Sequence, residues 1–157
     1  MAGAQRDGDP AEGLRYLLDR TAIADLVYTY ALNIRDGNGP GCAELFAEDA
    51  IFGMYGMEID GTRQLRKQIE GRDAIIEHIS ASSGGAARVC PMIHNLVIRI
   101  DGNSAESACT MTGVVIPGGD DFIGEYRDEF RWEGRWRFAV RNHTILLNRP
   151  PRAAGRQ

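Results

Sequence analysis

The stretch MIHNLVIRIDGNSAESACTMTGVVI, residues 92–116, decides the fold class of this chain. It holds two runs rich in apolar and β-branched residues, Met92 to Ile100 and Ala105 to Ile116, on either side of Asp101-Gly-Asn103. A short turn segment between two such runs is typical of an antiparallel hairpin. The pattern continues as two further runs and the turn segments before them: Pro117-Gly-Gly-Asp-Asp121, Ile123 to Trp132, Glu133-Gly134 and Trp136 to Leu147. The second half of the chain is therefore predicted to be a meander of antiparallel strands.

The first half of the chain is predicted to be mostly helical. Apolar residues recur there at steps of three and four, the period of a helix with one buried face: Leu14, Leu18, Ile23, Leu26, Val27, Tyr30, Ala31 and Ile34. The glycine-rich segment Asp36 to Gly41 ends this helix. The remaining predicted elements are a short helix at Cys42 to Phe46, a strand at Ile51 to Tyr55, an irregular stretch at Gly61 to Glu70, a helix at Arg72 to Ser80 and a loop at Ser82 to Ala87. Helices followed by a meander indicate an α+β fold, with the helices packed on one face of a curved antiparallel sheet.

Size and composition favour a single domain and exclude several functional classes. The 157 residues suit one domain, which we place at 13–148 between a flexible lead-in at 1–12 and a flexible tail at 149–157. The formal charge of −4 leaves no basic stripe for nucleic acid. The cysteines form no CxxC pair, the histidines have no metal-ligand spacing and there is no Gly-rich phosphate loop, so we expect no metal and no cofactor. No signal peptide or long apolar run is visible, so a soluble cytoplasmic protein without a membrane partner is expected.

Six short motifs in a characteristic order add a family resemblance. They are Ala22-Ile-Ala-Asp-Leu26 with Tyr30-Ala31, Leu45-Phe-Ala-Glu-Asp-Ala50, Gly71-Arg-Asp-Ala-Ile75, Asn95-Leu-Val-Ile-Arg-Ile-Asp-Gly102, Tyr126 with Asp128, and Gly134-Arg-Trp-Arg-Phe138 with Arg141. Together they resemble the SnoaL-like branch of the nuclear-transport-factor-2-like superfamily, which includes ketosteroid isomerase and scytalone dehydratase. The resemblance implies a cone-shaped sheet that encloses a pocket. It does not imply one reaction, because this fold carries enzymes of several kinds and plain ligand carriers.

The resemblance also indicates where a catalytic pair would normally lie. In the lytic enzymes of this branch, the base is usually an Asp five residues after the helix tyrosine. It works with a His four residues before the strand asparagine. Here those positions hold Arg35 and Pro91, while Asp36 and His94 lie close by in the sequence. Either the pair is displaced or this protein uses different chemistry.

The last predicted strand carries a candidate cation and a candidate acid or base. Regular alternation places Arg141 and His143 on one face and Trp136 and Phe138 on the other. The resemblance implies that the arginine faces the cavity, where a fixed cation can stabilise developing anionic charge. An inward histidine beside it is a natural acid or base. In the alternative interpretation both residues lie on the outer surface.

His94 is the second candidate acid or base. It shares its strand parity with Leu96 and Ile98, which places it with the apolar set. A histidine on such a face is either a core residue or a group in the cavity. A bulge near Pro91 would reverse this register and turn His94 outward.

The other candidate catalytic residues are Tyr30 and Asp128. Tyr30 lies on the core side of the first helix, so its phenol can donate a hydrogen bond to a substrate oxygen, or it can simply pack in the core. Tyr126 and Asp128 share a face with aromatic residues. A carboxylate there needs a partner, and Arg141 or His143 on the next strand can supply it. The alternative for Asp128 is a structural ion pair.

Four further residues complete the predicted site. Phe52, Met54 and Tyr55 are candidate substrate-binding residues, because apolar and methionine side chains suit an irregular hydrophobic ligand. The same residues are equally suited to a core. Asp36 is a candidate binding residue or displaced base, although its glycine-rich surroundings favour a turn.

These residues lead to a functional hypothesis with two alternatives. We expect a cofactor-independent lyase or isomerase acting on a hydrophobic cyclic or aromatic small molecule, by dehydration, double-bond shift or retro-aldol release. The alternatives are a non-catalytic carrier of a small ligand and the small subunit of a ring-hydroxylating dioxygenase. The resemblance further implies a homo-oligomer, a dimer or trimer, formed through the exposed face of the sheet.

Overall fold

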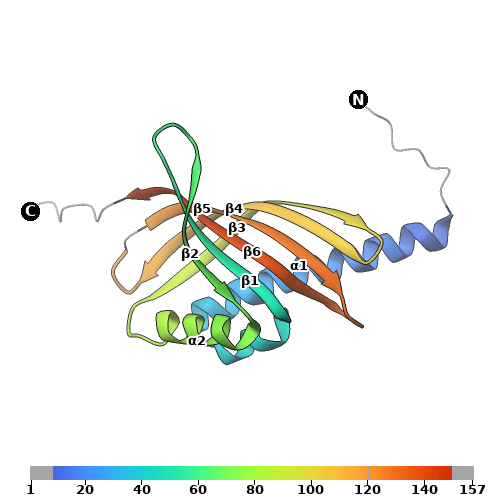
Figure 1. Cartoon of the computed structure of the whole chain (residues 1–157), viewed down its shortest axis with the longest axis horizontal. Coiled ribbons are helices and arrows are strands. Elements are labelled where there is room, and N and C mark those ends of the chain that lie inside the picture. The colour runs from blue at the N-terminus through green and yellow to red at the C-terminus, as the bar shows by residue number, and fades with distance from the viewer. Residues whose placement is uncertain (1–8, 120, 150–157) are drawn as a thin grey trace, which may run out of the picture.

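One helix and a curved six-stranded sheet form the framework of the protein (Figure 1). The computed structural model describes residues 9–119 and 121–149. Its elements are α1 (Pro10–Asp36), the 3-10 helix η1 (Pro40–Leu45), β1 (Phe46–Met57), β2 (Arg63–Glu70), α2 (Arg72–Ser83), β3 (Arg88–Asp101), β4 (Ser104–Ile116), β5 (Asp121–Trp132) and β6 (Trp136–Arg149). The strand order is β2-β1-β6-β5-β4-β3. Neighbouring strands are antiparallel except β1 and β6, which run parallel. The α+β class is confirmed.

Most predicted elements are present, and two differ. The four C-terminal strands and their turns are confirmed, each within a few residues of its predicted ends. The stretch Gly61 to Glu70, predicted to be irregular, contains the strand β2. The error has a physical reason, because β2 lies at the sheet edge and only Ile69 is buried, so its sequence is polar throughout. The predicted helix at Cys42 to Phe46 is the 3-10 turn η1, and Phe46 already begins β1.

The helix α1 is longer than the sheet that it covers. Asp9 caps its start by accepting a hydrogen bond from the Ala11 backbone, and Gly37, with φ 69°, ends it. Leu14 and Leu18 were expected on the buried face, but they are 59% and 62% exposed. The reason is visible in Figure 1, where the first turns of α1 project beyond the sheet. The predicted lead-in and tail fall largely outside the described residues.

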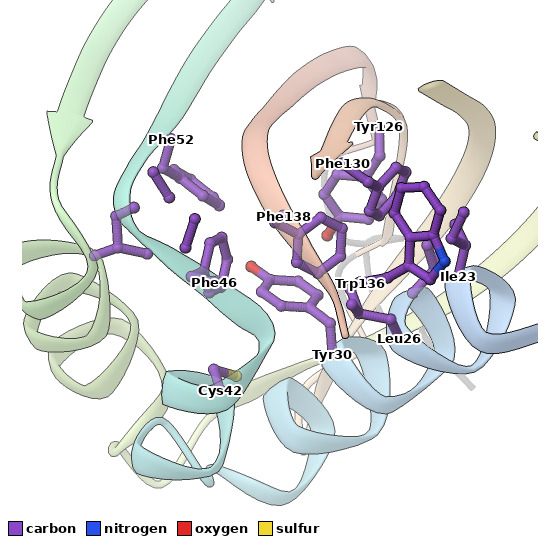
Figure 2. Close-up of a cluster of buried hydrophobic side chains, with 14 of the residues drawn as sticks. Ile23, Leu26, Tyr30, Cys42, Phe46, Phe52, Tyr126, Phe130, Trp136 and Phe138 are labelled. Atoms are coloured by element: carbon purple, nitrogen blue, oxygen red, sulfur yellow. The ribbon is translucent and has the colours of Figure 1, made fainter. Parts of the chain in front are cut away.

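An aromatic core joins α1 to the sheet (Figure 2). Tyr30 points from α1 toward the strands, and its ring meets Phe46 and Phe138 edge-on at centroid distances of 6.0 Å. Phe138 also packs on Phe46 and on Phe130, at 5.1 Å in each case. The Trp136 indole donates a 2.9 Å hydrogen bond to Asp19 and so ties β6 to α1. These contacts hold the helix against the concave face of the sheet.

Two irregularities decide which residues face this core. In β3 the register shifts between His94 and Val97, and Asn95 has a φ of 53°. Ile93 and Leu96 can therefore both pack on the core, although regular alternation would separate them. In β6 the pairing shifts so that Glu129 faces Val140 while Phe130 faces Phe138.

The second shift corrects a prediction about the last strand. Phe138 and Arg141 were expected on opposite faces, yet both are buried and the guanidinium carbon of Arg141 lies 4.5 Å from the Phe138 ring centroid. The extra residue at the shift puts them on the same side of the sheet. Among residues 9–119 and 121–149, no helix is long and apolar enough to cross a lipid bilayer.

The bulge at Asn95 makes a testable contribution to stability. Asn95→Val should lower the free energy of unfolding by about 1–2 kcal/mol, because a β-branched residue is strained at positive φ. Asn95→Gly should leave stability within about 0.5 kcal/mol of the wild type. Urea denaturation of the two variants measures the difference, and equal midpoints would contradict the assigned backbone conformation.

Candidate active site

Arg141 lies at the centre of the candidate site, completely buried between aromatic rings. Its guanidinium carbon is 4.0 Å from the ring centroid of Tyr30 on α1 and 3.8 Å from that of Tyr126 on β5. A cation over the faces of two electron-rich rings is attracted by both, and the attraction is larger when water is excluded. The exposed fraction of Arg141 is 0%. The two tyrosines therefore hold a charged group in a dry interior.

The charge partner of Arg141 leaves much of its hydrogen-bonding capacity unused. Asp128 Oδ2 lies 3.6 Å from Arg141 Nη1, an ion-pair distance longer than a good hydrogen bond. Ser107 donates a 3.3 Å hydrogen bond to the same oxygen. Among the residues that the structure describes, Asp128 Oδ1 and all three side-chain nitrogens of Arg141 have no hydrogen-bond partner. Buried polar atoms are normally satisfied, so this cluster has donors and an acceptor available for a ligand.

His143 lies on the same face of β6, next to the arginine. Its ring is 5.0 Å from that of Tyr126 and 6.2 Å from that of Phe122. Burial and, to a smaller extent, the positive charge of Arg141 together lower the pKa of His143 to about 4. The imidazole is therefore neutral at neutral pH. Its Nε2 is buried without a partner in the described part of the chain, so it can accept a proton or a hydrogen bond there.

Burial also sets the protonation of the other polar groups. It raises the pKa of Asp128 to about 6, although Arg141 and the Ser107 hydroxyl act in the opposite direction. It raises the pKa of Tyr126 to about 12 and holds that of Tyr30 well above its ordinary value. Both phenols are therefore protonated and can act as hydrogen-bond donors. The cluster combines one fixed cation, two phenol groups and one neutral imidazole.

The strand β1 supplies an apolar wall beside the cluster. In the parallel pair of β1 and β6, Phe52 is the partner of Arg141 and Met54 is the partner of His143. Phe52 is buried and Met54 packs on the core cluster. Tyr55 faces the other side of the sheet, where its ring lies so close to Gly53 that a Cβ there would be 2.7 Å from it. Tyr55 is therefore separated from Arg141 by the sheet.

The displaced pair suggested by the sequence does not form. The bulge turns His94 to the exposed face, where its Nε2 lies 3.2 Å from the Thr112 hydroxyl. Pro91, in contrast, is buried. Asp36 is exposed at the end of α1 and accepts a 2.8 Å hydrogen bond from Arg35. The expectation that His94 faces inward is wrong, and neither His94 nor Asp36 is part of the buried cluster around Arg141.

Two residues of the site were not predicted. Ser107 could have been found by extending the alternation of β4 back from Met111, because both are inward-facing and buried. Gly124 gives no comparable signal in the sequence. A Cβ at Gly124 would lie 3.1 Å from both His143 Nε2 and Met111 Sδ, so glycine allows the histidine to pack against β5.

The structure also contains a cleft on the opposite face of the sheet. It has a volume of about 530 Å³, and exposed residues such as Val97, Arg99, Glu106 and Arg127 contribute to its lining. Their side chains come from β3, β4 and β5. Ser107 and Asp128 also belong to its lining, so the cleft borders the buried cluster from the other side of the sheet, while Arg141 itself is not among the lining residues.

Comparison with known proteins agrees with this architecture. The SnoaL-like domain family matches residues 15–142, so the chain belongs to that family. A search of curated proteins found no match. Among solved structures, an NTF2-like protein with a cystatin-like fold from Novosphingobium aromaticivorans is 22% identical, with a TM-score of 0.71 over 90% of this chain and 92% of that one.

Two further solved structures carry enzyme names. A scytalone dehydratase-like protein from the same organism is 18% identical, with a TM-score of 0.72 over 90% of this chain and 97% of that one. The hexachlorocyclohexane dehydrochlorinase LinA-type3 from Novosphingobium barchaimii is 16% identical, with a TM-score of 0.72 over 91% and 95%. At these identities the similarity shows a shared fold alone.

The low pKa of His143 predicts a specific pH dependence of stability. Between pH 6.5 and about 4 the unfolded chain binds a proton at His143 and the folded chain does not. The contribution of the neutral, buried His143 to the free energy of unfolding is therefore complete above pH 6.5 and is lost as the pH falls toward 4. His143→Gln removes the titration. Relative to wild type, the variant should gain up to about 3 kcal/mol between pH 7.5 and pH 4.

Urea denaturation of both proteins at several pH values measures this gain. The raised pKa of Asp128 acts in the opposite direction, since its contribution is lost as the pH rises toward 6, but it is present in both proteins and cancels in the difference. A constant difference between the two proteins from pH 7.5 to 4 would show that His143 is not desolvated.

Proposed function

We propose that this protein is a cofactor-independent lyase or isomerase that acts on a hydrophobic cyclic or aromatic small molecule. The observation that supports the proposal best is the fully buried guanidinium of Arg141, whose donors have no partner among the described residues, beside the neutral imidazole of His143. Removal of a proton next to a carbonyl group needs a base and a stabiliser for the resulting oxyanion. The cluster contains both groups in a water-excluded setting.

The proposed reaction assigns one task to each group. His143 Nε2 takes a proton from the substrate carbon next to the carbonyl, and the electron pair moves onto the carbonyl oxygen. Arg141 and the phenols of Tyr30 and Tyr126 donate to that oxygen. The enolate then either expels a leaving group, which is a lyase reaction, or is reprotonated at another carbon, which is an isomerisation. Asp128 holds the guanidinium in place.

Substrate entry requires movement of side chains near the cluster. The exposed fractions of Arg141 and Asp128 are 0% and 2%. Met54 and Phe122 are only partly buried and pack on the edge of the core, and Phe122 also contacts His143. We assign these two side chains as the ones that move. Both are apolar, which suits a hydrophobic ligand.

A non-catalytic carrier would bind the same class of ligand without turnover. The absence of the usual Asp and His from their family positions favours this second function. The small-subunit alternative rests on the fold alone. Binding and proton transfer must therefore be measured separately.

Ligand binding should depend on Arg141. In a thermal-shift screen of cyclic ketones and aromatic carbonyl compounds, a ligand at about 100 times its Kd should add about 2.7 kcal/mol of stability, which is several degrees. The shift should disappear in the double variant Arg141→Met with Asp128→Asn, which removes both buried charges together. Arg99→Met, in the outer cleft, is the matched control and should retain the shift. Loss of the shift only in Arg99→Met would move the binding site to the outer cleft.

Proton abstraction should depend on His143. For ligands that bind, incorporation of deuterium from D₂O next to the carbonyl can be followed by NMR, and His143→Gln should lower its rate by at least ~10²-fold. His94→Gln, on the exposed face, should stay within about twofold of the wild type. Binding without any exchange in the wild type would favour the carrier, and a larger loss in His94→Gln than in His143→Gln would contradict the assigned base.

A further inference from the structure

The free side of α1 carries an apolar stripe that nothing in the described chain covers. Its members recur at alternating steps of four and three, and we call them the α1 stripe: Leu14, Leu18, Thr21, Asp25, Tyr28 and Leu32. The four large apolar members are 59%, 62%, 46% and 48% exposed, and Leu17 at 59% lies beside them. The buried residues of α1, from Ile23 to Ala31, lie on the opposite side and pack toward the sheet.

The exposed apolar area of this surface is larger than that of apolar residues scattered singly over a protein surface. With about half of each large side chain exposed, the stripe and Leu17 present on the order of 500 Å² of apolar surface, at the upper end of what a monomer usually exposes. The turns that contain Leu14 and Leu18 also project past the sheet. Helical turns without tertiary packing are marginal in water, although Asp9 caps this end. A partner that covers the stripe would stabilise these turns.

The spacing of the stripe is symmetric about position 23. Leu14 and Leu32 stand nine residues on either side of it, Leu18 and Tyr28 stand five, and Thr21 and Asp25 stand two. In an antiparallel pair of two α1 helices, Leu14 would therefore face the partner's Leu32, and Leu18 the partner's Tyr28. A two-fold interface brings the same patch of both copies together, so a stripe that matches its own reverse is suited to it.

We propose that two copies of this chain associate through their α1 stripes, antiparallel across a two-fold axis near position 23. The apolar layers lie toward the ends of the contact, and Thr21 faces the partner's Asp25 near its centre, where a polar layer fixes the register. The contact would bury roughly 1,000 Å² in total, the lower limit for a specific interface. A reversible dimer is therefore expected rather than a permanent one.

The sheet offers a less suitable surface for the same purpose. Its outer face carries exposed charges of both signs, among them Arg99, Glu106, Arg127 and Glu129, around a cleft of about 530 Å³. The α1 stripe contains only one ionised residue, Asp25. A contact through the stripe therefore removes fewer charges from water than a contact through the sheet would.

Cross-linking of a cysteine placed next to the axis tests the pairing and its direction. Ala22→Cys should cross-link to itself with a short bis-maleimide, because residue 22 of each copy lies beside the two-fold axis. Arg20→Cys lies within the same turn of α1, is also exposed and points away from the stripe, so it is the matched control. We expect at least about fivefold more cross-linked dimer from Ala22→Cys, above the background of the natural cysteines in the wild type.

Charge substitutions in the stripe then test its composition. Adding Leu18→Glu to Ala22→Cys should remove the cross-link, and adding Tyr28→Lys as well should restore part of it, because each Glu then faces a Lys of the partner. Sedimentation at about 1 to 100 µM should rank the dimer fractions of these variants in the same order as the cross-linking does. Unchanged melting temperatures at low concentration would show that the exposed substitutions leave the fold intact.

Three results would overturn the proposal. Equal cross-linking of Ala22→Cys and Arg20→Cys would exclude the antiparallel register. A dimer that persists in Leu18→Glu would assign association to another surface, such as the sheet. If the wild type stayed monomeric at every concentration and pelleted with lipid vesicles through Leu14 and Leu18, the stripe would be assigned to a membrane surface instead.

Discussion

The guanidinium of Arg141, stacked between the rings of Tyr30 and Tyr126, is the interaction on which the interior of this protein depends. It joins α1 to the two strands at the centre of the sheet, and it puts a positive charge where the core would otherwise be apolar. The charge requires Asp128 nearby, and burial together with this charge lowers the pKa of His143 and keeps it neutral.

Much of the fold could be predicted because its signals are local. The hairpins around Asp101-Gly-Asn103 and Glu133-Gly134 are determined by turn residues and by the apolar runs that flank them. The strand β2 could not be predicted, since an edge strand buries only Ile69 and has no hydrophobic pattern. The N-terminal turns of α1 were also misjudged. Helical periodicity alone does not show where the sheet beneath the helix ends.

The candidate site could be predicted only where strand alternation is regular. Tyr30, Tyr126 and Asp128 are buried, as the strand and helix patterns suggested, and Phe52 and Met54 on β1 pair with Arg141 and His143 on β6. The bulge at Asn95 turned His94 outward, and the shift in β6 put Arg141 on the same face as Phe138. One extra residue in a strand reverses every face beyond it, and nothing in the composition of these strands marks the position. The family positions hold Arg35 and Pro91, and the displaced pair considered at Asp36 and His94 does not form, whereas the buried polar groups lie on β5 and β6.

In the proposed reaction, the donors of Arg141 that have no partner among the described residues bind the substrate oxygen. NMR of arginine side-chain N–H groups, without and with a saturating cyclic ketone identified by thermal shift, tests it most directly. The Arg141 signals should move and exchange more slowly with water when the ligand binds, while those of Arg99 and Arg127 stay in place. Signals of Arg141 that do not respond, together with shifts at Arg99 and Arg127, would contradict the claim and place the ligand in the cleft on the outer face of the sheet.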